Sequence, residues 1–276
     1  MATPQVVSKA AVKTRKQPEL SHDYVHEALP VRKIGVSDLV DALRLGWADF
    51  MAKPSHIIFL GLIYPVAGLL LAQLSINNNV LPLLFPLLAG FALIGPFAGL
   101  GLYEISRRRE LGLDTSWRHA LDVFDARSIR SILILGGMLF VLFGIWLWAA
   151  MAIYGWAFRG QDPGSIGAFI TSVTTTADGF RLIVVGHMVG LAFAIVALML
   201  SAVSFPLLLD KHTDVGVAIA TSTRAVLKNP VTMSLWGGII TLALGVGALT
   251  AFVGLTIFIP VLAHASWHLY RKITTV

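Results

Sequence analysis

The sequence of 276 residues contains no cysteine. That absence excludes disulfide bonds, thiolate metal sites, iron–sulfur ligation by cysteine and a cysteine nucleophile. Charged residues are also scarce, at 13% of the chain, whereas a soluble domain has roughly 25%. Hydrophobic residues make up 56% of the chain, and the mean hydropathy is +0.78. This composition is typical of a protein whose solvent is a lipid bilayer.

Apolar blocks almost free of charge define the predicted membrane spans. The last block, 231–270, would be about 60 Å long as one helix, twice the thickness of the hydrocarbon core, so we divide it around Gly245 to Ala251. The predicted spans are 57–74, 80–105, 131–158, 182–209, 231–248 and 251–270. Because Pro96 removes a backbone hydrogen bond inside the second span, we expect a kink there.

Basic residues are distributed unevenly among the connections. Eight, six, three and two Lys or Arg residues lie in 1–56, 106–130, 210–230 and 271–276, which together hold 19 of the 21 in the chain. Only Arg159 and Arg181 lie elsewhere. Since cytoplasmic loops are enriched in Lys and Arg, we predict a multi-pass protein of the bacterial inner membrane with both termini in the cytoplasm. The net charge of +6 is then explained by anionic lipid at the membrane surface and by the orientation of the chain in the membrane. We therefore expect no nucleic-acid partner.

Three short amphipathic segments precede the predicted pairs of spans. They cover 36–50, 115–124 and 217–230, and the apolar positions 36, 39, 40, 43, 47 and 50 of the first share one helical face. We interpret the pattern as three repeats of an interfacial helix and a transmembrane hairpin. The predicted fold is therefore all-α: a six-helix membrane domain, 36–276, built as three hairpins, after a disordered cytoplasmic tail, 1–35.

Residues that could carry chemistry are few. The predicted spans contain no Asp, Glu, Lys or Arg except Glu104 and Asp210 at their inner ends. Ionisable residues deep in a membrane usually mark ion or proton pathways, so a charge-relay pump lacks its expected parts. The sequence has no nucleotide-binding loop, nucleophile elbow or zinc-protease signature. We predict that the protein is not an enzyme and expect no cofactor.

The histidines of the last span are weak candidates for a metal site. His264 and His268 are one helical turn apart, and Glu104 occupies the matching position of the second span. Two imidazoles at i and i+4 share a helical face and could bind a metal ion. The competing interpretation is that His268 anchors the interface and His264 bonds to a neighbouring helix, and we favour it. A haem between His187 and His264 is disfavoured, because their predicted depths differ by about 10 Å.

The densest charge cluster is Arg107, Arg108 and Arg109, followed by Glu110, directly after the second span. These arginines fix that end of the helix on the cytoplasmic side. They could also contact anionic lipid at the cytoplasmic face or an acidic partner. The two roles are compatible.

Several motifs resemble those of a known family. They are Trp236-Gly237-Gly238, Gly254-Leu255 with Pro260, the run from His264 to Arg271, and Pro96 with Tyr103-Glu104 and Arg107-Arg108. The chain is similar over about 35–272 to a proteobacterial family of uncharacterised integral membrane proteins, a domain of unknown function. The resemblance implies six helices in the inner membrane. Members are often labelled cytochrome c oxidase subunit I, but that subunit has many more spans and histidine ligands, so no ligand is carried over.

Three functions remain open from the sequence. The leading hypothesis is a non-catalytic membrane protein that packs against, or assists assembly of, a larger complex such as a respiratory one. The second is a small-solute transporter or channel, which would need polar groups converging where Pro96, Pro206 and Pro260 break their helices. The third is a haem- or metal-binding redox membrane protein.

Overall fold

The structure is a computed structural model that describes residues 25–52, 66, 68–70, 73, 81–159, 161 and 164–274. Every element in these residues is helical, which confirms the predicted all-α class for this part of the chain. The elements are α1 (Val36–Ala52), η1 (Leu81–Leu83), α4 (Leu84–Ala98), α5 (Leu100–Glu110), η2 (Trp117–Asp125), α6 (Ile129–Phe158), α7 (Ile166–Thr175), α8 (Ala177–Ser201), α9 (Ser204–Asp210), α10 (Val215–Lys228), α11 (Pro230–Leu249) and α12 (Leu255–Ile273). Most of the first predicted span, 57–74, lies outside the described residues.

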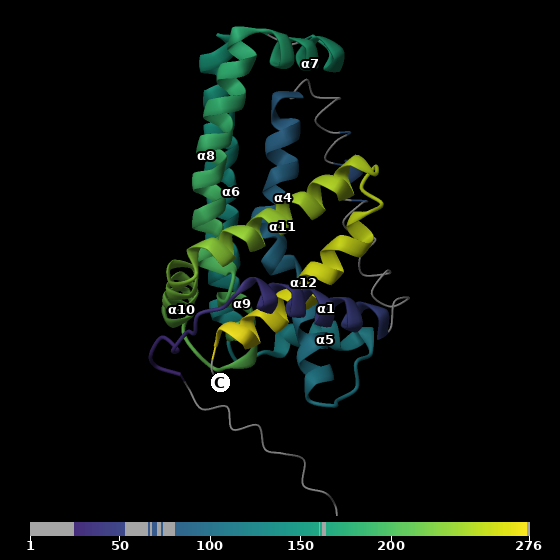
Figure 1. The fold of residues 1–276 in the computed structure, drawn as a ribbon, viewed down its shortest axis with the longest axis vertical. Coiled ribbons are helices and arrows are strands. Elements are labelled where there is room, and N and C mark those ends of the chain that lie inside the picture. The colour runs from purple at the N-terminus through teal and green to yellow at the C-terminus, as the bar shows by residue number, and fades with distance from the viewer. Residues whose placement is uncertain are drawn as a thin grey trace, which may run out of the picture.

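Three segments among the described residues are long and apolar enough to cross a membrane. They are α6, α8 together with α9, and α11. Helices α6 and α8 lie side by side, with α4 beside α6, and α11 and α12 run obliquely to them (Figure 1). At 30 residues, α6 is about 45 Å long, so it exceeds a hydrocarbon core of about 30 Å. An arrangement of six spans as three hairpins stays a prediction.

The second predicted span, 80–105, is interrupted at Gly99. Helix α4 ends at Ala98, two residues after Pro96, and α5 begins at Leu100. Pro96 has no backbone N–H to donate to the helical ladder, but the ladder is present again at Gly99, whose N–H donates to the carbonyl of Gly95 at 2.8 Å. The second predicted span is thus broken at a single residue close to Pro96, where the kink was expected, and Glu104 belongs to α5.

The fourth predicted span, 182–209, is also interrupted before a proline. Helix α8 ends at Ser201 and α9 begins at Ser204, with Pro206 in its first turn. The backbone N–H of Val203 leaves the helical ladder and donates to Ser222 Oγ of α10 at 3.1 Å. A side chain of α10 thus satisfies a buried donor that the interruption exposes.

The last apolar stretch, 231–270, forms two helices, as predicted. The turn lies later than the two glycines expected to make it, because α11 continues through Gly245 and Gly247 to Leu249. Ala251 and Phe252 have φ angles of 51° and 66°, which L residues rarely adopt. Thr250 Oγ1 accepts from the N–H of Gly254 at 3.0 Å and closes the turn.

An extended segment, 25–34, crosses α10 and the end of α12. Asn229 accepts from the N–H of Ile34 at 2.9 Å and donates to the carbonyl of Arg32 at 3.1 Å. The N–H of Leu29 donates to Thr221 Oγ1, and Val31 pairs with Thr274. The predicted disordered tail, 1–35, overlaps this segment, which these bonds order from residue 25 onward; residues 1–24 lie outside the described ones.

The short helices gather at one end of the molecule. Helices α1, α5, α9 and α10 and the end of α12 lie together there, whereas α7 lies at the far end of α6 and α8 (Figure 1). The basic cluster of α5 is therefore close to segments that are distant from it in sequence.

Candidate functional site

The candidate site forms where α1 crosses α12, a contact made possible by small residues. A Cβ atom on Gly46 would lie 2.6 Å from the backbone nitrogen of Ala265 and 2.8 Å from the carbonyl oxygen of Val261. Ala42 on the same face is fully buried. The absence of side-chain bulk at these positions lets the backbones of the two helices approach closely.

The buried face of α1 differs from the apolar face predicted for it. The residues that pack inward are Leu39, Ala42, Gly46, Asp49 and Phe50. Of the positions on the predicted apolar face, Leu39 and Phe50 are buried, whereas Val36, Val40 and Trp47 are exposed at 59, 58 and 49%. The buried face therefore combines two large apolar residues with the small Ala42 and Gly46, and it carries one carboxyl group into the interior.

That carboxyl group, Asp49, is the centre of a polar cluster of five side chains. Its Oδ2 accepts from Ser106 Oγ at 2.5 Å and from His268 Nε2 at 2.8 Å. Its Oδ1 lies 3.3 Å from the guanidinium of Arg109. His264 Nδ1 lies 2.7 Å from the same Ser106 Oγ. Helices α1, α5 and α12 each contribute, and we call these five residues the Asp49 cluster.

The cluster contains Ser, His and Asp, but their connection differs from a catalytic triad. In a triad the histidine lies between serine and carboxylate and accepts the serine proton. Here Ser106 lies between the other two and donates to Asp49, because a carboxylate can only accept. Ser106 is 1% exposed and His264 is fully buried. No substrate can reach the hydroxyl without moving α1 or α12, so the geometry favours a structural role.

The hydrogen bonds of the cluster imply an ionised Asp49. Burial by itself raises the pKa of the Asp49 carboxyl, but the hydrogen bonds from His268 and Ser106 outweigh burial and place the pKa below the ordinary value of 3.8. Asp38, at the start of α1, accepts from the backbone N–H of Gly35 at 2.9 Å, and this bond lowers the pKa of Asp38 as well. Both carboxylates therefore hold α1 in place in their charged forms.

We predict that the protein loses stability in acid as these carboxylates protonate. A carboxyl whose pKa is lowered by folding stabilises the native state above the unfolded pKa and loses that contribution as pH falls through the folded one. The thermal unfolding midpoint in detergent should therefore fall as the pH drops from about 4 toward 2. The decrease should be smaller in an Asp49→Asn variant. An identical pH dependence in both proteins would contradict the assignment.

A second set of polar contacts ties α12 to α5 and α9. Glu110 accepts from Trp267 Nε1 at 3.1 Å and pairs with Arg271 at 3.0 Å. Asp210 accepts from the Tyr270 hydroxyl at 2.8 Å and lies 3.4 Å from Arg271. The two aromatic side chains are buried and their charged partners are partly exposed, and together they hold α12 on the side opposite its glycine contact.

The structure separates the three weak metal candidates. His264 and His268 belong to the Asp49 cluster. Glu104 instead pairs with Arg107 at 3.3 Å and with Arg108 at 3.8 Å on another face of α5. In the part of the chain that the structure describes, no group of three or more His, Asp or Glu residues could hold a metal ion.

The predicted lipid contacts are engaged within the protein. Arg107 and Arg108 bind Glu104, and Arg108 also lies 3.1 Å from Asp122 of η2. Arg109 binds Asp49 and donates to the carbonyl of Ala48 at 2.8 Å. Each guanidinium therefore has an internal partner, and their contact with lipid stays a prediction.

Similarity to known proteins covers the middle of the chain, from the start of α4 to the end of α9. Residues 84–210 match the model of the family described as Predicted integral membrane protein (DUF2189). The match confirms, over this segment, the resemblance that the motifs indicate. It includes Ser106 and Arg109 of the Asp49 cluster but neither Asp49 nor the two histidines. No curated protein and no solved structure matches the chain.

Sequence reasoning missed Asp49 and Ser106. The available signal was the spacing of Ala42 and Gly46, which are four residues apart and mark a helix face suited to close packing. Asp49 lies one turn after Gly46 on that face. Ser106 had no comparable signal, because a single serine beside three arginines resembles any helix end.

Proposed function

We propose that this protein is a non-catalytic protein of the bacterial inner membrane that packs against the subunits of a larger membrane complex, such as a respiratory complex. In this proposal six helices span the bilayer as three hairpins, and both termini lie in the cytoplasm. The observation that carries the proposal is an open apolar groove along one face of α11.

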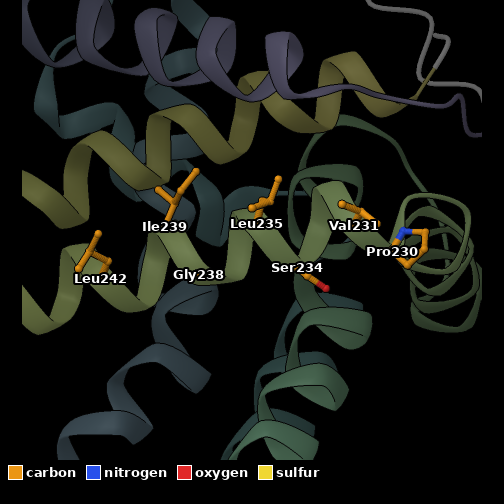
Figure 2. A pocket seen from close by; sticks show the side chains of 7 residues that line it. All are labelled: Pro230, Val231, Ser234, Leu235, Gly238, Ile239 and Leu242. Carbon is orange, nitrogen blue, oxygen red and sulfur yellow. The ribbon is translucent and has the colours of Figure 1, made fainter.

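The groove has a volume of about 610 Å³ and is lined by residues of α11 alone. Figure 2 shows these residues following one another along the helix: Pro230, Val231, Ser234, Leu235, Gly238, Ile239 and Leu242. Ser234 and Gly238 provide small residues four apart, the spacing at which helices approach closely in membranes. A transmembrane helix of a partner subunit fits such a surface, because small residues let the backbones of two helices approach closely.

The Asp49 cluster supports a non-catalytic role. Asp49, Ser106 and His264 are buried and bonded mainly within the cluster, and their arrangement differs from that of a nucleophile activated by a base. The cluster fastens an amphipathic helix, α1, whose exposed Val36, Val40 and Trp47 suit the boundary of a bilayer.

Gentle solubilisation tests the proposed complex directly. On a native gel we expect the protein to migrate with co-purifying membrane subunits, and a Gly238→Leu change, which fills the groove, should release them. The matched control is Gly186→Leu on α8, where a Cβ atom meets no neighbour within 4 Å. Migration as a lone monomer in several mild detergents would contradict the proposal, as would complexes unaffected by Gly238→Leu.

The proposed orientation rests on the charge distribution and can be tested by labelling. Since the natural chain has no cysteine, single cysteines provide clean reporters. An Arg118→Cys variant should resist an impermeant thiol reagent in intact cells and react in inverted vesicles, whereas Gly167→Cys in α7 should show the opposite pattern. Labelling of both positions from the same side would overturn the topology.

A further inference from the structure

A charged pocket lies at the ends of α6 and α9, separate from the Asp49 cluster. Its volume is about 270 Å³, and it is lined by α5, the end of η2, the residues just before α6, and the end of α9 with the two residues after it. This volume is below the roughly 300–1,000 Å³ of sites for drug-sized ligands, so only a small group fits. Four cationic and four anionic side chains contribute: Arg107, Arg108, Arg127, Lys211, Glu104, Asp122, Asp125 and Asp210.

Most of these charges are engaged within the protein. Glu104 and Asp122 pair with Arg107 and Arg108, as described above, and Asp210 pairs with Arg271 and Tyr270. The side chains of Arg127, Lys211 and Asp125 form no ion pair or hydrogen bond with any described residue. Arg127 and Lys211 are therefore two cations of the lining that have no anionic partner among the described residues.

The pocket lies at the boundary of the proposed bilayer. Ile129, two residues after Arg127, is the first residue of one candidate span, and Asp210, next to Lys211, is the last residue of another. Leu208 and Leu209 form an apolar wall. The start of α6 adds the positive end of a helix dipole next to Ser128. Lipid phosphates lie just outside the hydrocarbon core, at the level of these helix ends.

We propose that this pocket binds the phosphodiester of an anionic glycerophospholipid. Arg127 and Lys211 contact the phosphate oxygens, and Leu208 and Leu209 face the first carbons of the lipid chains. A phosphodiester carries one negative charge and supplies the anionic partner that Arg127 and Lys211 lack. The arginines of α5 act indirectly, because their ion pairs with Glu104 and Asp122 shape the wall.

Native mass spectrometry of the full chain in mild detergent tests the site, with phosphatidylglycerol as the probe. The double variant Arg127→Ala with Lys211→Ala should bind it roughly 30-fold more weakly, since each basic residue near a membrane surface contributes about 1 kcal/mol. The control double variant, Arg44→Ala with Arg118→Ala, removes the same charge outside the pocket and should bind like the natural chain. The thermal unfolding midpoints identify any variant that fails to fold, and in that case Arg127→Gln alone should bind about fivefold more weakly.

Three results would overturn the proposal. One is equal retention of phosphatidylglycerol by the natural chain and the pocket variant. Another is an equal loss in the control variant, which would indicate nonspecific charge attraction. The third is displacement of the lipid by millimolar inorganic phosphate, which would assign the pocket to the free ion. Phosphatidylethanolamine should bind more weakly than phosphatidylglycerol, because its headgroup has no net charge.

Discussion

Replacing Asp49 with alanine should destabilise the protein by about 3–5 kcal/mol, the usual cost of removing one partner from a buried ion pair. The change leaves Ser106, His268 and Arg109 without the carboxylate that they share. Ser106 and His268, which are largely shielded from water, then lose this partner without regaining water, whereas Arg109 is partly exposed and keeps its bond to the carbonyl of Ala48. Thermal or denaturant unfolding in detergent measures the loss, and limited proteolysis should cut near α1 first.

Asp41→Ala is the matched control on the same helix. Asp41 is half-exposed and pairs with Lys272 at 3.2 Å and Arg44 at 3.7 Å. An exposed ion pair contributes about 0–1 kcal/mol, so this variant should unfold close to the natural protein. Equal destabilisation by the two changes would show that Asp49 is no more than a surface charge of α1.

Replacing Gly46 with alanine should separate α1 from α12 and cost about 1–3 kcal/mol, as overpacking in a well-packed interior does. The added methyl group would lie 2.6 and 2.8 Å from backbone atoms of Ala265 and Val261, and backbone cannot move aside as a flexible side chain can. The loss should appear as a lower unfolding midpoint and as easier proteolysis of α1.

Gly137→Ala in α6 is the control for helix propensity. A Cβ atom on Gly137 meets nothing within 4 Å. Alanine is favoured over glycine inside a helix by roughly 0.5–1 kcal/mol, so this variant should be as stable as the natural protein or more so. If Gly46→Ala is equally harmless, α1 does not depend on close contact with α12.

Hydropathy predicted the long helices well because burial in lipid leaves a strong local signal. The span predicted at 131–158 became α6, Ile129–Phe158, and the stretch 231–270 divided into two helices. The interruptions at Gly99 and before Ser204 were harder to predict. Proline indicates that a ladder is weakened, but the position of the break depends on partners such as Ser222, which lie elsewhere in the sequence.

The site was predicted less well, because its residues meet only through tertiary packing. His264 and His268 were recognised from their spacing, yet the partner expected for them, Glu104, points to Arg107 and Arg108. Ser106, two residues after Glu104 on α5, lies on the face that meets α12. A helix turns by 100° per residue, so choosing a face requires knowing the angle at which two helices cross.

The extended segment at 25–34 can complete its contacts only late in the synthesis of the protein. Its partners are Asn229 on α10 and the last turn of α12, where Arg32 donates to the carbonyl of Ile273 at 2.9 Å. At about 5–20 residues per second, a ribosome needs roughly 12–48 s to add the approximately 240 residues that separate them. Residues 25–34 therefore complete their contacts only near the end of synthesis: the bonds to His212, Thr221 and Asn229 can form earlier, but a ribosome that stops before α12 leaves Val31 and Arg32 without their partners Thr274 and Ile273.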